Sequence, residues 1–414
     1  MLSLCSSLLI LISANTYRQP EWQAVADALK EEHADMTVNV LVAAPAITDF
    51  KPGAEGLPHR YAAVVMTPEE AKAETITSIG KAMSELDGDP YEDAIWGVVT
   101  GPTAADALRM VRSKEPGEIE SALGTTGLDK HLVKGPMAVF SDGNPPGNWW
   151  VKDEAGKVEE FSSEGDLSSA FGEAWGKIDP ELLVTSSHAS ERNLEMPFSR
   201  GNIVATEAGL AEYANAALID YSTGQAKEEK LAASLKPLKA PVKEKVWLAA
   251  GNCLIANNQG KPNMVMTALG WGKCNQFFGY MTTTWFGFMG WETLRQYGSV
   301  GRPLGEARYA AKVTLQAALG SVEPGSFEEK GLKWDENATV LYGDPLKKHT
   351  VKRKGIGAWN EGDLPLVIVL PEAKRDWKAV KVPEGAQVEI HDDFAFAVGY
   401  PAMGEDWEKE FRFE

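Results

Sequence analysis

The chain has 414 residues, of which 44% are hydrophobic and 24% charged, a balance typical of a globular protein with two or three domains. The formal net charge of -18 repels phosphate backbones and excludes nucleic acid as a partner. The three cysteines and six histidines form neither a disulfide framework nor a zinc motif, so the sequence predicts no metal site of that kind and no cofactor.

The apolar stretch 8–12 is predicted to be the first strand of a domain. The alternative is the apolar region of a signal peptide, but no Lys or Arg precedes the stretch and no clear cleavage site follows it. It is also too short to cross a bilayer, and no other stretch predicts a membrane span.

Strands and helices are predicted to alternate along the first two thirds of the chain. Strands are expected at 8–12, 37–43, 61–66, 94–100, 136–140, 181–187, 246–250, 264–269 and 337–342. Helices are expected at 21–33, 68–86, 103–112, 167–175, 206–221, 228–240, 290–297 and 305–319, and 142–166 is expected to be a loop. This order predicts an α/β fold whose sheet is mostly parallel and flanked by helices.

The composition changes toward the C-terminus, where the helical period is lost. Short strands separated by turns are predicted at 365–370, 377–382, 387–391 and 394–398. The predicted division is an N-terminal α/β subdomain at 1–135, a second α/β subdomain at 136–347 and a small β-sandwich-like domain at 348–414.

Two predicted strands end in reactive side chains. One apolar run leads into His188, and another leads through a Gly-Asn turn into Cys253. If the two strands are parallel neighbours, the imidazole and the thiol meet at the edge of the sheet where α/β proteins keep their sites. A thiol beside an imidazole is the chemistry of a cysteine nucleophile with a histidine base.

Four segments, in this order, resemble the gingipain-like cysteine peptidases of the caspase-type clan. They are Asp89-Pro-Tyr-Glu-Asp-Ala-Ile-Trp-Gly97, the strand into His188, the strand into Cys253, and Val340-Leu-Tyr-Gly-Asp-Pro345. The resemblance implies a caspase-like fold with a C-terminal β domain, a polypeptide substrate and export from the cell. Three positions depart from the family pattern, namely Ala189 for glycine, Asn252 for alanine and Val98 for arginine.

The resemblance also assigns roles to single residues. Cys253 and His188 would be catalytic, and the backbone N–H groups of Ala189 and Cys253 would bind the oxyanion. Asp142, Trp271 and Trp285 fall in segments that the family uses for substrate binding. The implied activity is hydrolysis of peptide bonds through an acyl-enzyme.

Other interpretations stay open at this point. Cys253 could be a structural cysteine, and the chain could be an inactive member that acts as a binding or surface protein. A doubly wound nucleotide-binding protein is disfavoured, because no glycine-rich phosphate loop follows a strand. The cluster of Asp87, Asp89 and Asp93 could hold a structural calcium ion or form a solvated turn.

Overall fold

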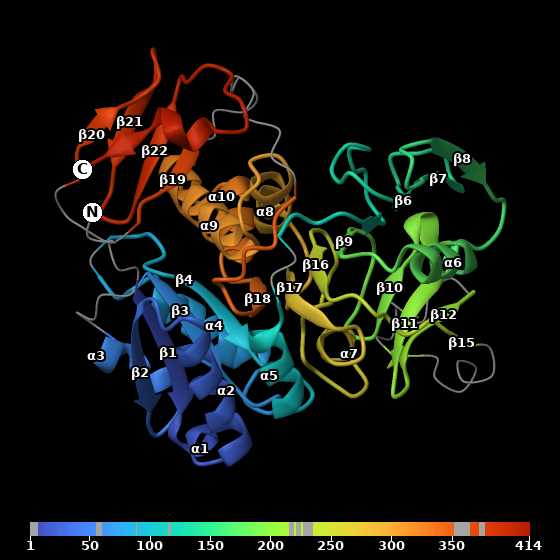
Figure 1. The fold of residues 1–414 in the computed structure, drawn as a ribbon, viewed down its shortest axis with the longest axis horizontal. Coiled ribbons are helices and arrows are strands. Elements are labelled where there is room, and N and C mark those ends of the chain that lie inside the picture. Colours follow the sequence, from blue (N-terminus) through green and yellow to red (C-terminus); the bar gives the residue numbers. More distant parts are fainter. Residues whose placement is uncertain are drawn as a thin grey trace.

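Within the described residues, a computed structural model contains one twelve-stranded sheet that runs through the molecule (Figure 1). The structure describes residues 7–54, 60–87, 89–114, 117–214, 219–220, 225–226, 235–351, 365–371 and 377–414. From one edge to the other, the strands are β2 (Thr37–Ala43), β1 (Ser7–Ser13), β3 (Tyr61–Val65), β4 (Ile95–Val99), β18 (Thr339–Gly343), β17 (Cys274–Tyr280), β16 (Lys245–Ala249), β9 (Leu182–Thr185), β5 (Ala122–Gly124), β6 (Met137–Phe140), β7 (Asn148–Lys152) and β8 (Val158–Ser162).

The sheet consists of two parallel groups that run in opposite directions. Strands β2, β1, β3, β4 and β18 run one way, and β17, β16, β9, β5 and β6 run the other way. The reversal occurs between β17 and β18, which pair antiparallel. The carboxyl ends of β17, β16, β9 and β6 therefore lie along one common edge of the sheet, opposite the edge where β1, β3 and β4 end.

Helices cover both faces of this sheet. They are α1 (Ala14–Tyr17), α2 (Pro20–Glu32), α3 (Lys51–Ala54), α4 (Ala73–Met83), α5 (Ala104–Arg112), α6 (Ser168–Ile178), α7 (Met264–Leu269), α8 (Phe288–Gly298), α9 (Leu304–Ser321) and α10 (Phe327–Asp335). In β16, Trp247 packs into the cluster that holds α6 and α7, whereas Val246 and Leu248 pack into the cluster that holds α8 and α9. Every residue of β16 is buried, and the alternation explains why its sequence after Lys245 is a continuous apolar run.

The predicted α/β class is confirmed, and several predicted elements are found at their expected positions. Strand β2 and strand β22 (Phe394–Val398) have the predicted bounds, and β1 is fully buried. Helix α5 begins after Thr103, whose hydroxyl accepts from the N–H of Asp106 while the Asp106 carboxylate accepts from the N–H of Thr103. The described part of the chain contains no helix that is both long and apolar enough to span a membrane.

The prediction of a strand at 264–269 is wrong, because these residues form helix α7. The side chain of Asn263 accepts a hydrogen bond from the N–H of Met266 and so caps the helix. The chain must cross from β16 to its parallel neighbour β17, and such a crossover needs a connection that is usually helical. The strand after the crossover is β17, at which no strand was predicted.

Two further predictions are wrong because hairpins stand in their place. The expected loop 142–166 contains the antiparallel pair β7–β8, and the expected helix 206–221 overlaps the pair β11 (Asn202–Thr206) and β12 (Gly209–Tyr213). All residues of β8 are exposed, so β8 shows no apolar alternation. In the second hairpin, Gly209 has a φ of 124°, which a helix does not allow. The expected helix 228–240 lies largely outside the described residues, and its described end contains β15 (Lys236–Pro237).

Small antiparallel sheets follow β18 at the C-terminal end of the chain. Strands β19 (Leu366–Val369), β22 and β21 (Gln387–Ile390) form one, and β20 (Ala379–Lys381) pairs with β23 (Arg412–Phe413) in another. Figure 1 shows these strands grouped beyond α9. The remaining short elements are β10 (Asn193–Glu195), β13 (Ile219–Asp220), β14 (Gln225–Ala226), η1 (Ile47–Phe50), η2 (Pro197–Ser199) and η4 (Trp407–Glu410).

The predicted domain boundaries stay predictions. The first one, between 135 and 136, falls between β5 and β6, which are paired strands of the same sheet. The second, between 347 and 348, falls in the segment that follows β18.

Candidate active site

Cys253 lies in the turn that follows β16. Gly251 starts this turn and has no room for a side chain, because a Cβ there would lie 2.2 Å from the Ser186 hydroxyl oxygen. Cys253 itself is half-buried, and its Sγ accepts a hydrogen bond from the main-chain N–H of Thr284 at 3.2 Å. Leu254, the next residue, has a φ of 58°, an unfavourable conformation for a branched side chain that turns the chain back toward β17. The thiol is thus held at the carboxyl edge of the sheet.

His188 lies in the loop that follows β9, and its side chain is exposed. Its main-chain oxygen accepts from the N–H of Glu195 at 2.8 Å, which fixes the loop against β10. Strands β9 and β16 are parallel neighbours, with Thr185 paired to Ala249. His188 follows Thr185 by three positions and Cys253 follows Ala249 by four, so both residues lie in adjacent loops at the same edge.

A buried network joins these two loops. The side-chain amide of Asn252 donates to the main-chain oxygen of Ser187 at 2.9 Å, and its Oδ1 accepts from the Thr185 hydroxyl at 2.6 Å. The Thr185 oxygen accepts in turn from the indole N–H of Trp247 at 2.9 Å. Asn252 precedes Cys253 and Ser187 precedes His188, so one side chain couples the positions of both candidate catalytic residues.

Ala189 can replace glycine without backbone strain. The φ of Ala189 is not positive, so its backbone does not adopt the left-handed conformation that favours glycine. Ala189 and Leu194 form an antiparallel bridge in which the flanking residues make the hydrogen bonds, from Glu195 N–H to His188 O and from Ser190 N–H to Asn193 O. In such a bridge the N–H of the central residue points away from the partner strand. The N–H of Ala189 is therefore directed out of this small ladder.

Trp285 belongs to a partly exposed aromatic cluster beside Thr284. Its ring lies 5.3 Å from Phe327 and 6.3 Å from Trp334, centroid to centroid, in edge-to-face contacts. The Trp334 indole donates to the main-chain oxygen of Thr283 at 2.9 Å and so connects α10 to the segment that contacts Cys253. Trp285 is 48% exposed, which leaves about half of its surface open to a ligand.

The other two predicted substrate-binding residues lie in different places. Asp142 is exposed in the turn after β6, at the same sheet edge as Cys253 and two strands beyond β9. Trp271 precedes β17, whereas Trp285 follows it, so the two tryptophans lie at opposite ends of a seven-residue strand that is about 23 Å long. The structure therefore does not bring Trp271 to the edge of Cys253, and its role in substrate binding stays a prediction.

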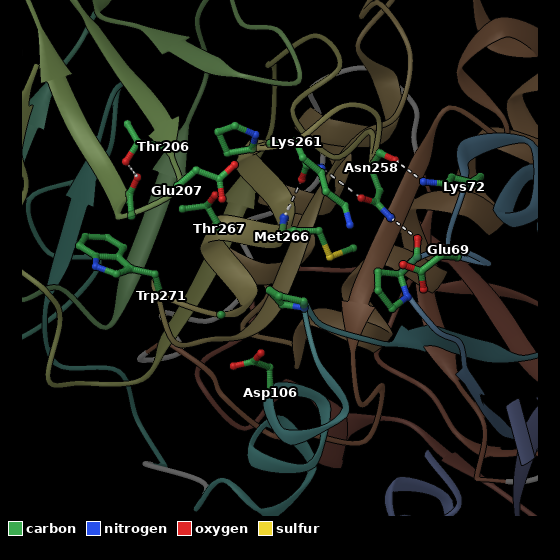
Figure 2. A pocket seen from close by; sticks show the side chains of 16 residues that line it. Glu69, Lys72, Asp106, Thr206, Glu207, Asn258, Lys261, Met266, Thr267 and Trp271 are labelled. Carbon is green, nitrogen blue, oxygen red and sulfur yellow. Dashed lines mark hydrogen bonds between the residues drawn. The ribbon is translucent and has the colours of Figure 1, made fainter. Parts of the chain in front are cut away.

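Trp271 instead lines a cleft of about 440 Å³. Figure 2 shows Trp271 and Glu207 on one side of the cleft, and Glu69 and Lys72 on the opposite side, with Asn258 nearby. The buried Asn258 side chain holds the wall together by donating to the main-chain oxygens of Pro68 and Ala71 at 2.6 and 3.2 Å. Among the described residues that line this cleft, Trp271 alone was predicted to bind substrate.

A second buried network positions α8 behind the Cys253 turn. The Asp335 carboxylate accepts from the N–H of Met289 at 2.6 Å and from the Tyr280 hydroxyl at 3.1 Å, and this hydroxyl accepts from Gly290 N–H. Burial raises the pKa of Asp335, against the effect of these donors. A Cβ on Gly290 would lie 1.8 Å from the main-chain oxygen of Ala250. The helix backbone thus touches the chain just before Cys253.

The aspartates of the predicted calcium cluster bind N–H groups of their own turn. Asp87 accepts from the N–H of Asp89, Asp89 from that of Tyr91, and Asp93 from that of Leu86. Burial, together with the neighbouring carboxylates, raises the pKa of Asp93 to about 8. Within the described residues, three or more acidic, His or Cys side chains do not gather in a metal-binding arrangement. Calcium binding by these residues stays a prediction.

Sequence reasoning missed Thr284 and the role of Asn252. Asn252 departs from the family pattern at the sequence level, and in the structure its fully buried side chain couples the two loops. The sequence signal that could have indicated this role is the polar side chain of Asn252 directly before Cys253, in a turn between apolar segments. Thr284 carries no such signal, because it contacts Sγ through its main chain, which every residue type has.

The sequence matches no protein-family model and no curated protein. Among solved structures, the complex of the Porphyromonas gingivalis RgpB pro- and mature domains aligns with a TM-score of 0.50 at 10% identity, over 99% of each chain. The Arg-specific cysteine proteinase gingipain R (RgpB) aligns with a TM-score of 0.49 at 10% identity, over 99% of this chain and 94% of that one. A structure described as a protease gives 0.49 at 9% identity, over 99% and 96% of the two chains.

This chain has a gingipain-like fold. The full-length alignment with the RgpB complex agrees with the mixed sheet, its flanking helices and the small C-terminal sheets. At 10% identity the likeness concerns the fold and not the activity. Any activity of this gingipain-like chain must be argued from its own residues.

Proposed function

We propose that the protein is a cysteine-type endopeptidase with Cys253 as nucleophile and His188 as general base and acid. The observation that carries this proposal is the coupling of the two loops through the bond from Asn252 to Ser187. This bond fixes the residues that precede the thiol and the imidazole, at the carboxyl ends of two paired parallel strands. A fixed nucleophile and base at one sheet edge is the arrangement that acyl transfer needs.

In the proposed reaction, His188 takes the proton of the Cys253 thiol, and Sγ attacks the carbonyl carbon of the scissile peptide bond. The tetrahedral intermediate collapses when the C–N bond breaks, and the leaving amine takes the proton from His188. Water then attacks the thioester, its proton passes to His188, and the S–C bond breaks to release the carboxylic acid. The sulfur regains the proton, and the cycle closes without a cofactor.

Two main-chain donors support stabilisation of the oxyanion. The N–H of Ala189 is directed away from its bridge to Leu194, and the N–H of Cys253 belongs to a turn of fixed geometry. Preorganised donors aimed at the developing negative charge lower the barrier of acyl transfer. The N–H of Thr284 contacts Sγ at 3.2 Å and so helps to hold the sulfur in place.

Substrate binding is proposed to involve Asp142 and Trp285, which flank the Cys253 edge from two sides. Asp142 is an exposed carboxylate that would pair with a basic side chain. Trp285, four strands from β6, offers a half-exposed ring for stacking against a different side chain of the same peptide. Asp142 would thus select a peptide that carries Lys or Arg on its side of the scissile bond.

The test is cleavage of a mixed peptide library, read by mass spectrometry. The wild-type chain should cut the library, the Cys253→Ala variant should not, and the Cys274→Ala variant should cut it like the wild type. Cys274 is the matched control, because it is buried at the start of β17 and burial raises its pKa to about 12. If neither the wild type nor Cys253→Ala cuts the library, or if both cut it alike, Cys253 is not the nucleophile of a peptidase and the proposal is wrong.

A further inference from the structure

A cavity of about 530 Å³ lies between the α/β body and the C-terminal sheets, at the same edge of the sheet as Cys253 but four strands away from β16. On one side it is lined by Arg60 and Tyr61, where β3 begins, and by Arg302 and Glu306 near the start of α9. On the other side it is lined by β19 and by the segment 407–413. Charged groups and apolar side chains thus face one cavity that is partly open to solvent.

Arg60 is a buried cation, and two of its nitrogen donors make no hydrogen bond to the described residues. Its side chain is 2% exposed, and its Nη1 donates to the Asp393 carboxylate at 2.8 Å. Its Nε and Nη2 are also buried, and neither has a hydrogen-bond partner in the described part of the chain. These two nitrogens share one edge of the planar guanidinium, the edge that binds a carboxylate or phosphate through two parallel hydrogen bonds. Buried donors without partners are rare and indicate that a water, an ion or a ligand binds there.

A second buried guanidinium adds positive charge to the same cavity. Arg302 donates to the main-chain oxygen of Val367 and to the side-chain oxygen of Gln296, and it lies over the ring of Trp407 at 5.2 Å. The indole N–H of Trp407 is buried and, within the described residues, also has no partner. Two residues that line the cavity thus carry three N–H donors without a partner among the described residues. Each of these nitrogens has less than 1 Å² of accessible surface, so a ligand reaches them when the side chains around them shift.

Two acidic residues also line the cavity and set a limit on what binds there. Glu306 is half-buried and accepts a hydrogen bond from the Tyr61 hydroxyl at 3.4 Å. Glu408 is exposed at the rim. Because Glu306 carries the same sign of charge as an anionic ligand, its removal should strengthen the binding of an anion.

We propose that this cavity binds an organic anion with an apolar body. The carboxylate or phosphate head would accept hydrogen bonds from Nε and Nη2 of Arg60, and the apolar body would lie among Ile368, Leu370 and Phe411, which are buried on the opposite wall. The site is separate from the proposed catalytic residues, so the two proposals stand or fall independently. It would couple ligand binding to the contact between the α/β body and the C-terminal sheets.

The first test is calorimetric titration of the full chain with octanoate, octyl phosphate and octanol. Octanoate or octyl phosphate should bind, and octanol, which has the same apolar body without the charge, should bind at least 10-fold more weakly. Comparison of the two anions identifies the head group that the site prefers. If neither anion binds, or if octanol binds equally well, the proposal is overturned.

Two variants locate the binding site. Arg60→Lys keeps the positive charge beside Asp393 but cannot form two parallel bonds, and it should weaken binding of the preferred anion about 10-fold or more. Glu306→Gln has the same shape without the charge, and it should tighten binding several-fold. Should Arg60→Lys not fold, Glu306→Gln still decides, since unchanged affinity in that variant would place the anion elsewhere and overturn the proposal.

Discussion

The side-chain amide of Asn252 donates a hydrogen bond to the main-chain oxygen of Ser187 at 2.9 Å, across two neighbouring parallel strands. This bond joins the residue before the candidate nucleophile to the residue before the candidate base. Its donor is fully buried, and its Oδ1 is bonded to Thr185, so the amide has little freedom to move. A departure from the family pattern therefore acts as a fixed spacer between the thiol loop and the imidazole loop.

Replacing Asn252 with alanine should destabilise the protein. The change removes the donor to the Ser187 oxygen and the acceptor of the Thr185 hydroxyl proton, and unsatisfied buried polar groups cost about 1–3 kcal/mol. We expect a lower midpoint of urea unfolding with an unchanged slope. Asn257→Ala is the matched control. Asn257 lies in the same loop, and its side chain makes no hydrogen bond to any described residue. Equal midpoints in the two variants would contradict the coupling.

Replacing Gly290 with alanine should be far more damaging than the same change at Gly298, although both glycines lie in α8. A Cβ at Gly290 would lie 1.8 Å from the Ala250 oxygen, so the helix must move away from the turn that carries Cys253. We expect a loss of about 2 kcal/mol or more. At Gly298 the nearest atom to a Cβ is 3.6 Å away, and alanine there should be neutral or stabilising by up to about 1 kcal/mol. Thermal unfolding of both variants is the measurement, and similar midpoints would disprove the close contact.

Removal of the Trp285 side chain should affect activity rather than stability. Trp285 is 48% exposed, so Trp285→Ala should change the free energy of unfolding by less than about 1 kcal/mol. If the ring contacts substrate, kcat/KM for a cleaved peptide should fall roughly 10-fold or more, which corresponds to about 1.4 kcal/mol. Phe161→Ala, at a 41% exposed aromatic residue on the outermost strand β8, is the control and should leave kcat/KM unchanged. A wild-type kcat/KM in Trp285→Ala would remove this residue from the substrate site.

His349 should make the protein less stable in mild acid. Burial, reinforced by the charge of Lys347, lowers the pKa of His349 to about 4, against about 6.5 in an unfolded chain. Between these two values the unfolded chain binds a proton that the folded chain does not, so stability falls as the pH falls from about 6.5 to about 4, by up to about 3 kcal/mol. His349→Leu should lose less stability than the wild type between pH 7 and pH 4.5, as measured by thermal unfolding. His131→Leu, at an exposed position, controls for the loss of one histidine. A pH dependence like that of the wild type in His349→Leu would show that His349 does not titrate as its burial requires.

The sheet and its loop ends could be predicted because its buried strands are continuous apolar runs bounded by polar turns. Strand β16 is buried on both faces and leads directly to Cys253, so one pattern predicted both the element and the candidate residue. The same reasoning applies to β9 and His188. Their adjacency, however, depends on contacts between distant segments, and only the family resemblance suggested it.

Elements whose pattern is ambiguous were not predictable. The six residues of α7 form a short apolar run that also fits a buried strand, and only the capping side chain of Asn263 favours the helix. The alanine-rich segment around Gly209 suggests a helix, but the ring of Trp271 packs directly against this glycine, where a Cβ would lie 2.4 Å from the ring. Such a contact comes from a residue 62 positions away and leaves no trace in the local sequence.

The central claim is that Cys253 is a reactive thiol poised by His188, and its most direct test is the rate of alkylation by iodoacetamide at neutral pH. The rate is followed residue by residue by mass spectrometry. We expect Cys253 to react much faster than the buried Cys274, and to slow in His188→Ala but not in His131→Ala. If Cys253 reacts no faster than Cys274, or at the same rate in His188→Ala as in the wild type, the catalytic pairing of Cys253 with His188 is contradicted.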